Sequence, residues 1–262
     1  MEDGYGRRIS YLRVSVTDRC NFRCGYCLPR SHRDFATPAD WLDPAELARI
    51  VGLFARLGVR HVRLTGGEPL VRPELADIAR RIAALPGIED LSLSTNASRL
   101  AGLAPSLRAA GIRRLNVSLD SLDPVRFREL TGGRLQSVLA GIEAAREAGF
   151  GPIKINMVVM RGRNDDEVDA MVDFCRDHAL TLRFIETMPI GQAGQAAQAD
   201  YLPLDEIEER LRRRFRLEPA AMHGSGPARY FRVDDSALRI GFITPQSQHF
   251  CDTCNRVRLS AT

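Results

Sequence analysis

Short apolar segments alternate with longer amphipathic segments along most of the chain, and Gly or Pro stands at most of the junctions. The apolar segments have the length of strands and lie at 9–16, 59–66, 91–95, 113–120, 154–159 and 182–186. Helical periodicity marks the segments 44–58, 73–87, 104–111, 134–149 and 165–179. Six strand–helix alternations predict an α/β fold with a parallel sheet and outer helices. Because strand–helix–strand crossovers are right-handed, we expect the sheet to curve into a partial (β/α)6 barrel of the TIM type.

The first five predicted strands carry polar residues at alternate positions, although strands of parallel sheets are usually apolar on both faces. Residues two apart share one face of a strand. The shared faces hold Arg13, Ser15 and Thr17; His61, Arg63 and Thr65; Ser92, Ser94 and Asn96; Asn116, Ser118 and Asp120; and Lys154 and Asn156. This pattern predicts a hydrated barrel interior, whose basic residues favour an anionic ligand. An open antiparallel sheet with one solvated face is the alternative, and the long helical connections argue against it.

Residues 189–262 are predicted to form a small extension that covers the opening of a barrel made by residues 1–188. Gly, Gln and Ala dominate 189–203, which predicts a flexible loop at the start of the extension. Beyond this loop we expect a helix at 204–215 and two short strands at 229–233 and 238–243. A polar segment with a cysteine pair follows them.

Length and composition fit one large α/β domain with an appendage, since 44% of the 262 residues are hydrophobic and 27% are charged. No stretch approaches the ~20 apolar residues that cross a membrane, and no secretory signal opens the chain. We therefore expect a cytoplasmic protein with no membrane partner. The net charge of +4 allows an anionic ligand but does not call for nucleic acid, which we do not expect as a partner.

Five of the six cysteines lie in two clusters, which in such a chain favours metal or redox chemistry over disulfides. The first cluster, CNFRCGYC, follows the first predicted strand and places Cys20, Cys24 and Cys27 at C-x3-C-x2-C spacing. Three thiolates at this spacing can bind three irons of a cubane and leave the fourth iron open to a small molecule. Zinc is the alternative, but a structural zinc site takes a fourth protein ligand, and only His32 is near in sequence.

This cysteine motif, with Tyr26 before its last cysteine, resembles that of the radical S-adenosylmethionine (SAM) superfamily. A second landmark, TGGEP, stands at Thr65–Pro69 at the end of the second predicted strand. The resemblance implies that a 4Fe-4S cluster on the three cysteines binds SAM and cleaves it reductively to a 5′-deoxyadenosyl radical. It also implies that the glycines bring backbone close to the SAM amino group and that the acidic residue supports this site.

Five segments in order, at 15–27, 63–72, 113–123, 183–191 and 241–260, are similar to those of the GTP 3′,8-cyclase family, and the resemblance covers almost the whole chain. It implies a lyase that converts GTP into (8S)-3′,8-cyclo-7,8-dihydroguanosine 5′-triphosphate, the first step of molybdenum cofactor biosynthesis. In the implied reaction, the radical takes hydrogen from C3′ of GTP and the ribose radical attacks C8 of guanine. The protein would mainly orient GTP, since the cofactor supplies the difficult chemistry.

The resemblance assigns a role to residues that match the family motifs. Catalysis would depend on the cluster ligands Cys20, Cys24 and Cys27. The implied SAM contacts are Tyr26, Gly66, Gly67, Glu68, Ser118 and Met188. The implied GTP contacts are Arg13, Arg63, Ser94, Lys154, Arg256 and Arg258. Strand alternation independently turns Arg13, Arg63 and Lys154 inward, and such cations suit a triphosphate.

The second cysteine pair, Cys251 and Cys254, stands at C-x2-C spacing. In the family this pair joins a third cysteine further on and holds a second 4Fe-4S cluster, whose open iron binds the GTP base. The sequence ends at Thr262, before that third cysteine, and we expect two thiolates not to complete the cluster in the family manner. Cys175 lies within a predicted helix and is expected to be a buried apolar residue rather than a substitute ligand.

Two other functions are compatible with parts of the sequence. One is a different radical SAM enzyme with an auxiliary cluster, acting on a peptide or protein side chain, although the cationic interior argues against a neutral peptide. The other is a non-catalytic iron–sulfur electron-transfer module, which leaves TGGEP and the polar strand faces unexplained. As partners, the family resemblance implies GTP, a reductant such as flavodoxin (dithionite in vitro), a downstream cyclic pyranopterin monophosphate synthase and a homodimer.

Overall fold

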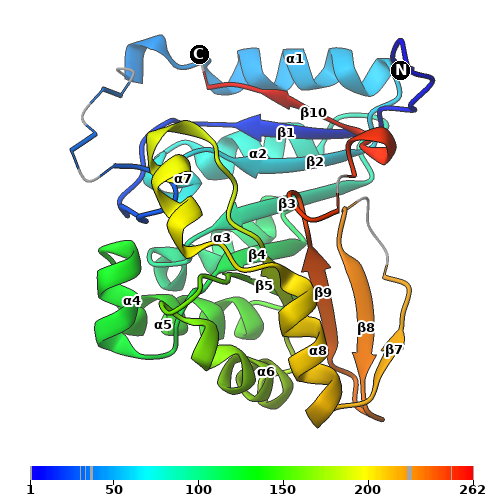
Figure 1. Ribbon diagram of the computed structural model, residues 1–262. Coiled ribbons are helices and arrows are strands. Elements are labelled where there is room, and N and C mark those ends of the chain that lie inside the picture. The colour runs from blue at the N-terminus through cyan, green and yellow to red at the C-terminus, as the bar shows by residue number, and fades with distance from the viewer. Residues whose placement is uncertain are drawn as a thin grey trace.

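One mixed sheet runs through the computed structural model, which describes residues 2–29, 31–32, 34–35, 38–222, 226–248 and 250–261 (Figure 1). Within those ranges the sheet has ten strands, in the order β10-β1-β2-β3-β4-β5-β6-β9-β8-β7. They are β1 (Tyr11–Ser15), β2 (His61–Thr65), β3 (Asp90–Thr95), β4 (Arg114–Ser118), β5 (Ile153–Val158), β6 (Thr181–Ile185), β7 (Leu217–Pro219), β8 (Arg229–Val233), β9 (Arg239–Ile243) and β10 (Arg256–Leu259). The first six pair in sequence order and in parallel, which confirms the predicted α/β fold and excludes the antiparallel alternative.

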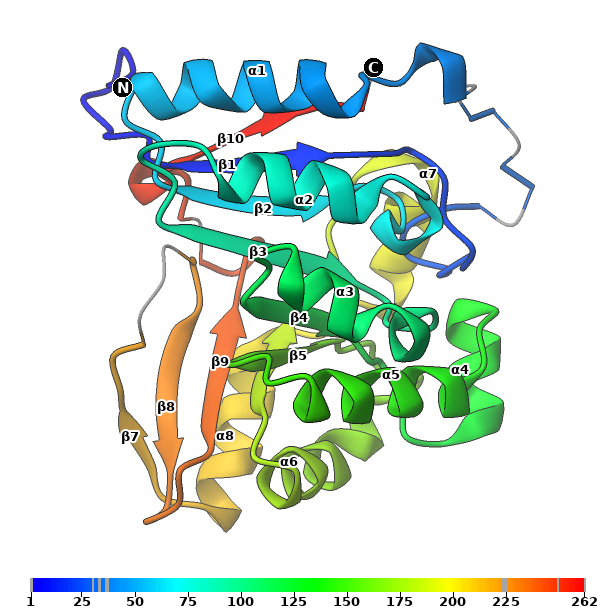
Figure 2. The same ribbon diagram turned by 180° about the vertical axis from the view of Figure 1, so that it is seen from behind.

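Helices connect the parallel strands and cover the outer face of the sheet, as Figure 2 shows for α2, α3 and α5. The helices are α1 (Pro44–Arg56), α2 (Leu75–Ala83), α3 (Ala104–Ala109), α4 (Pro124–Thr131), α5 (Leu135–Glu147), α6 (Val168–Asp177), α7 (Gly191–Ala196) and α8 (Leu204–Arg214). The apolar strand faces pack against them, so that side chains such as Leu12, Val14 and Leu64 are fully buried. This packing leaves the polar strand faces for the barrel interior.

Local sequence signals explain where the outer helices begin. In α1, Asp43 accepts hydrogen bonds from the backbone N–H groups of Ala45 and Glu46, at 2.7 and 2.8 Å. The Glu46 carboxylate accepts one in return from the backbone of Asp43, which completes a capping box before Pro44. The helix then buries Leu47, Val51 and Ala55 against the sheet at a helical spacing.

Two segments differ from the sequence prediction. The prediction of a flexible loop over 189–203 was wrong, because this segment contains α7 and a 3-10 helix, Ala197–Asp200. Helix α7 packs closely on the chain before it, since a Cβ atom on Gly194 would lie 2.4 Å from the carbonyl oxygen of Met188. Helix α4 was not predicted at all; Asp123 caps it, and it ends at Gly132 with φ of +71°.

The carboxyl-terminal segment extends both edges of the barrel sheet. Strand β10 pairs in parallel with β1, and β9 pairs in parallel with β6. Strands β8 and β7 continue the second edge in antiparallel order. The expected strands at 229–233 and 238–243 are therefore confirmed, whereas β10, in the basic sequence RVRL, was not predicted.

A buried carboxylate joins this segment to the end of β6. Glu186 is 1% exposed and accepts hydrogen bonds from the backbone N–H groups of Gln246 and Ser247, at 3.0 and 3.1 Å. The Ser247 hydroxyl (2.5 Å), the Tyr201 hydroxyl (3.3 Å) and the Leu204 backbone N–H (3.3 Å) donate to its other oxygen. The carboxylate thus holds β6, the start of α8 and the turn after β9 together.

We expect Glu186→Gln to lower the free energy of unfolding by about 2 kcal/mol, because an amide NH2 would face buried N–H donors that then lack an acceptor. For a chain of this size, that corresponds to a melting temperature lower by about 4–8 °C. Thermal unfolding followed by circular dichroism measures the change. Glu218→Gln, on the exposed strand β7, is the control with little effect, and equal melting temperatures for the two variants would contradict the assignment.

Candidate active site

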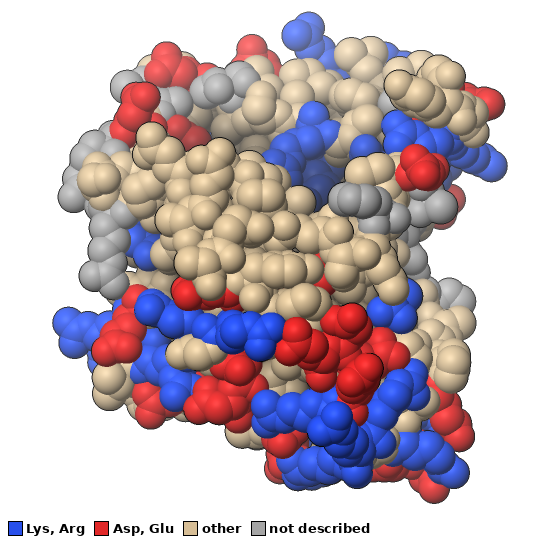
Figure 3. Space-filling view, in the orientation of Figure 1, with Lys and Arg blue, Asp and Glu red and all other residues tan. Residues whose placement is uncertain are grey.

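A cavity of about 630 Å³ occupies the interior of the barrel and takes side chains from β1 to β6, from β9 and β10, and from the loops that follow the strands. Its strand residues are Tyr11, Arg13, Arg63, Thr65, Ser94, Thr95, Ser118, Asn156, Arg183, Ile185, Ile243, Arg256, Val257 and Arg258. Figure 3 shows basic side chains set back in a hollow in the upper half of this face, above a broad area of neutral side chains. The polar strand faces therefore do line a barrel interior, as the alternation predicted.

Cys20, Cys24 and Cys27 lie on the loop after β1, and all three line the cavity. None is in a disulfide, and burial raises the pKa of the Cys20 and Cys24 thiols, that of Cys24 well above its usual value. The loop is tied to α4 by hydrogen bonds from the backbone N–H groups of Arg23 and Gly25 to the carbonyls of Thr131 and Leu130. Thiols of this kind become good ligands once a metal displaces their protons.

Among the residues that the structure describes, no group of three or more His, Cys, Asp or Glu side chains is gathered so as to hold a metal ion. A cubane cluster has a different requirement, because each thiolate binds a separate iron. Three thiols that line one cavity from one loop are the donor set that such a cluster takes.

The TGGEP turn packs directly against the chain that leads into the cysteine loop. The backbone N–H groups of Gly67 and Glu68 donate to the carbonyls of Thr17 and Arg19, both at 2.8 Å. A Cβ atom on Gly66 would lie 2.3 Å from the Thr17 carbonyl oxygen, and one on Gly67 would lie 2.3 Å from that of Arg19. Only glycine permits this approach, so the turn and the cysteine loop hold each other in place.

Glu68 turns its carboxylate into the protein, where it is 1% exposed. It accepts hydrogen bonds from the Thr95 hydroxyl and the Asn96 backbone, both at 2.6 Å, and from the Leu70 backbone at 3.0 Å. Burial raises its pKa to about 7 despite these donors. Glu68 therefore connects the ends of β2 and β3 beneath the glycine turn.

Tyr26, which is half-buried, pairs with the buried Asp120 at the same end of the cavity. The Tyr26 hydroxyl donates to Asp120 at 2.7 Å, and the Val158 backbone donates to the other carboxylate oxygen at 2.9 Å. Burial raises the pKa of Asp120 to about 6. Asp120 follows Ser118, the last residue of β4, so the pair links the cysteine loop to the polar end of that strand.

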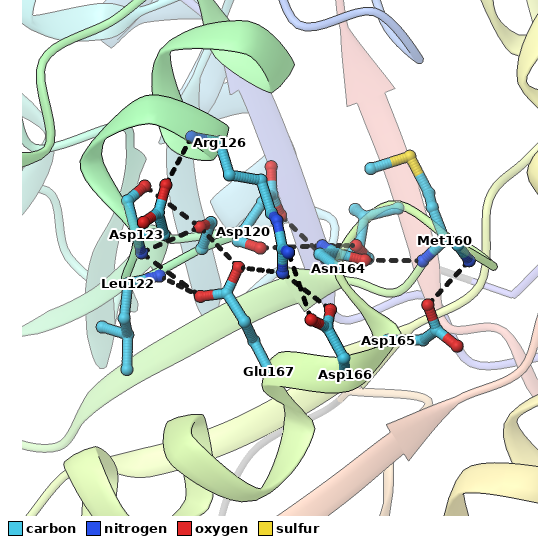
Figure 4. Close-up of polar contacts among 12 residues, drawn as sticks. Asp120, Leu122, Asp123, Arg126, Met160, Asn164, Asp165, Asp166 and Glu167 are labelled. Atoms are coloured by element: carbon cyan, nitrogen blue, oxygen red, sulfur yellow. Dashed lines mark hydrogen bonds and ion pairs between the residues drawn. The ribbon is translucent and has the colours of Figure 1, made fainter.

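The loop that carries Asp120 is fixed from behind by the polar network in Figure 4. Asn164 donates to the backbone carbonyls of Asp120 and Val158, at 2.7 and 2.9 Å. Glu167 accepts from the Ser121 hydroxyl and the Leu122 backbone, both at 2.7 Å, and forms an ion pair with Arg126. The loops after β4 and β5 thus behave as one unit.

Cationic residues from three neighbouring strands form a grid on one wall of the cavity. In the strand register, Arg258, Arg13 and Arg63 lie side by side on β10, β1 and β2. Burial lowers the pKa of Arg13 and of Arg63 to about 10, so both stay charged at neutral pH. The Nε atoms of both are buried without a hydrogen-bond partner in the described part of the chain. Such donors call for an anion in the cavity.

Other predicted contacts occupy different positions on or near the cavity. Ser94 and Met188 line it together with the grid, whereas Lys154 is not among the lining residues described. The Lys154 ammonium is 3.3 Å from the hydroxyl of Tyr230. The ring of Tyr230 packs against Gly241. Burial, reinforced by nearby arginines, lowers the pKa of Lys154 to about 7.

Arg183 is a cavity residue that the sequence analysis missed. It is 4% exposed and donates to the side-chain oxygens of Asn156 and Asn116, at 2.8 and 2.5 Å. Burial lowers its pKa. Strand alternation in LRFIE could have found it, since Arg183 on β6 is in register with Asn156 on β5.

The second cysteine pair lies near the opposite end of the strands from the first cysteine loop. Cys254 and Phe250 line the same cavity, and the pair precedes β10, which runs parallel to β1. Arg7 donates to the carbonyl of Cys251 at 2.6 Å and so attaches the amino-terminal segment to this pair. Cys175, by contrast, is fully buried in the core on α6, as predicted. No helix among the described residues is long and apolar enough to span a membrane.

Family models match two consecutive parts of the chain. Residues 14–175 match the Radical SAM superfamily, and residues 180–262 match Molybdenum Cofactor Synthesis C. Among structures, the chain resembles Streptococcus suis SuiB bound to S-adenosylmethionine, with a TM-score of 0.67 at 16% identity, over 97% of this chain and 59% of that one. Escherichia coli coproporphyrinogen III oxidase (HemN) gives a TM-score of 0.56 at 17% identity, over 78% and 52%. These likenesses show the radical SAM fold.

Curated relatives are similar over almost the entire chain. GTP 3′,8-cyclase 1 of Pseudomonas aeruginosa is 50% identical over 260 residues, which are 98% of this chain and 79% of the relative. GTP 3′,8-cyclase of Hydrogenovibrio crunogenus is 48% identical over 99% of this chain and 80% of the relative. That of Listeria monocytogenes is 46% identical over 100% and 79%. The chain therefore belongs to the GTP 3′,8-cyclase family of the radical SAM superfamily.

Proposed function

We propose that this protein is a GTP 3′,8-cyclase, which converts GTP into (8S)-3′,8-cyclo-7,8-dihydroguanosine 5′-triphosphate in the first step of molybdenum cofactor biosynthesis. The observation that carries the proposal is one cavity with the cysteine motif at one end, the second cysteine pair near the other, and buried arginines along the wall between them. A triphosphate is a ligand whose charge matches that wall. The same charge disfavours a neutral peptide as the substrate.

The residues at the cysteine end fit a 4Fe-4S cluster with SAM. Cys20, Cys24 and Cys27 would hold the cluster, and the candidate SAM contacts are Tyr26, Gly66, Gly67, Glu68, Ser118 and Met188. When bound, the cluster and SAM supply the radical chemistry. The backbone N–H groups of Gly67 and Glu68 are already used by the cysteine loop, so carbonyl oxygens of the turn remain as acceptors for an ammonium group. Tyr26 would be held by Asp120 beside this site.

The protein's own contribution is to bind GTP and to hold it still. Arg13, Arg63, Arg256 and Arg258 would bind phosphate oxygens, and Arg183 and Ser94 would contact the nucleotide from the facing strands. Fixed donors lose little entropy when the ligand arrives, and correct placement of the ribose relative to SAM accounts for much of the rate. The buried cavity also keeps water from reactive species.

The carboxyl-terminal extension is the part that we propose closes the cavity over the nucleotide. Residues 189–262 would cover the opening of the barrel formed by 1–188, and Cys251 and Cys254 would hold the second 4Fe-4S cluster together with a further ligand. We also propose a low-potential reductant such as flavodoxin as electron donor, and a cyclic pyranopterin monophosphate synthase as the enzyme that takes up the product. A cytoplasmic location and a homodimer are part of the same proposal.

Cys24→Ala should abolish the release of 5′-deoxyadenosine after anaerobic reconstitution with iron, sulfide, SAM and dithionite, because two thiolates do not hold the cubane in place. Iron and sulfide content and chromatography of the nucleoside products measure this. Cys175→Ala is the matched control, since this thiol is buried in the core away from the cavity, and it should keep both the cluster and the cleavage. Reconstituted protein that contains zinc, or a cluster whose spectrum ignores SAM, would contradict the proposed function.

Lys154→Ala should raise the dissociation constant of GTP about tenfold near pH 6, which is the effect of one charge-assisted hydrogen bond. The pKa of Lys154 is about 7, so its ammonium is present below that pH and lost above it, and the difference between wild type and variant should shrink as pH rises. Equilibrium dialysis with GTP over this pH range measures the effect.

Lys154→Arg is the control for charge at this position, because arginine stays protonated across the whole range. It should bind GTP without the pH dependence that the lysine causes. SAM cleavage should persist in both variants, because Lys154 is not among the described residues that line the cavity with the three cysteines. An unchanged GTP affinity in Lys154→Ala at low pH would show that this residue does not face the substrate.

A further inference from the structure

The hydroxyl of Tyr11 is a buried polar group without a hydrogen-bond partner in the part of the chain that the structure describes. Tyr11 is 3% exposed, yet it lines the cavity, so its hydroxyl is shielded from bulk water while it borders the internal space. Buried tyrosine hydroxyls almost always find a partner, since an unpaired one loses its hydration without compensation. An unpaired phenol at a cavity wall therefore indicates a ligand that supplies the missing acceptor.

The position of Tyr11 in the sheet shows which part of a ligand it meets. On β1 it shares a face with Arg13, two residues on, and in register it lies between Arg256 on β10 and His61 on β2. The row Arg256, Tyr11 and His61 thus runs directly beside the row Arg258, Arg13 and Arg63. Tyr11 is the phenol in a grid that is otherwise made of arginines and a histidine.

Contacts within the grid orient the phenol ring and leave its hydroxyl free. The Arg63 guanidinium carbon lies 5.3 Å from the centroid of the Tyr11 ring, and the His61 ring centroid is 6.3 Å away. Nδ1 of His61 and Nε of Arg13 and Arg63 are also buried without a hydrogen-bond partner among the described residues. The two carboxylates that line the cavity, Glu68 and Asp120, are engaged by other donors. Several polar atoms that lack a hydrogen-bond partner among the described residues thus belong to adjacent positions of β1 and β2.

We propose that the Tyr11 hydroxyl donates a hydrogen bond to the β- or γ-phosphate of the nucleotide and that, with His61 beside it, it makes the enzyme selective for the triphosphate over nucleotides that lack these phosphates. This inference rests on the proposed function and refines it. A neutral phenol adds a donor to the arginine grid without adding charge repulsion. It also gives direction, because a single O–H must point at one oxygen, whereas guanidinium groups accept several arrangements.

Packing alone does not explain a tyrosine at this position. A phenylalanine would present the same ring to Arg63 and His61 without burying an unpaired hydroxyl. The hydroxyl forms no hydrogen bond that would hold the fold together within the described residues, and its benefit arises when an acceptor enters the cavity. An effect of this one atom on binding without a loss of stability distinguishes a ligand contact from a structural one.

Tyr11→Phe tests this with the reconstituted holoprotein, by equilibrium dialysis against GTP and, separately, against GMP. We expect the dissociation constant of GTP to rise about tenfold, as for one lost charge-assisted hydrogen bond, and that of GMP to stay unchanged. The melting temperature of the ligand-free variant should be equal to or above that of wild type. His61→Gln should weaken GTP binding in the same direction and by a smaller factor. Tyr5→Phe, at a position 87% exposed, is the control with no effect.

Equal GTP affinities for wild type and Tyr11→Phe would overturn the inference, and so would an equal loss for GTP and GMP, which would place the hydroxyl on the base, the sugar or the α-phosphate. Arg13→Ala separates this failure from failure of the proposed function. If Arg13→Ala loses GTP binding while Tyr11→Phe does not, only the role of Tyr11 is wrong. If neither variant changes GTP affinity, the arginine grid is not the phosphate site and the proposed substrate itself is in error.

Discussion

Positive charge without a protein counter-ion lines the interior of the barrel, and most features of the site depend on it. Arg13, Arg63 and Arg183 are largely buried and face the cavity, and none of them forms an ion pair within the described residues. Burial deprives these groups of hydration, and nearby like charges repel them, which together depress their pKa. A fold tolerates this arrangement when a bound anionic ligand offsets the electrostatic free energy. Until the ligand binds, the rest of the sheet must be rigid enough to keep the arginines apart.

Rigidity at the other end of the cavity comes from backbone contacts rather than from charge. The glycine turn touches the chain before the cysteine loop so closely that any side chain at Gly66 or Gly67 would collide with backbone. Glu68 anchors the same turn to β3, and Tyr26 anchors the cysteine loop to Asp120 after β4. Four consecutive strand ends are thereby joined, so the thiols and the arginine grid keep a fixed separation across the sheet.

Much of the fold and of the cavity wall was predictable from the sequence, because strand alternation and helical periodicity indicate which side chains face inward. Alternation along strands placed Arg13 and Arg63 inside the barrel, and helical periodicity located α1, α2, α5 and α6. Interactions between distant segments were not predictable. Lys154 was expected in the cavity, but Tyr230 of the distant strand β8 stands at its ammonium.

The other features that the sequence did not predict have similar causes. The basic segment RVRL gave no strand signal, because its apolar residues are few and its pairing with β1 fixes it as β10. Segment 189–203 looked like a loop because its small and amide residues carry no apolar periodicity, whereas a close contact of Gly194 with the Met188 carbonyl holds α7 in place. Tyr11 was not predicted as a site residue, because an aromatic side chain in a strand is ordinarily apolar packing; its hydroxyl, which has no hydrogen-bond partner among the described residues, is what distinguishes it.

The carboxyl-terminal segment supplies part of the cavity wall. Arg256 and Arg258 belong to β10, and they complete the grid only while that strand pairs with β1. The same segment holds Cys254 at the cavity. Its turn after β9 is fixed to the end of β6 by Glu186. Substrate charge and extension docking then stabilise each other: an anion between Arg13 and Arg258 offsets the repulsion across the β1–β10 pair, and the paired strand in turn holds Arg258 where the anion binds. Binding of the nucleotide should thus be linked thermodynamically to closure of this edge of the barrel.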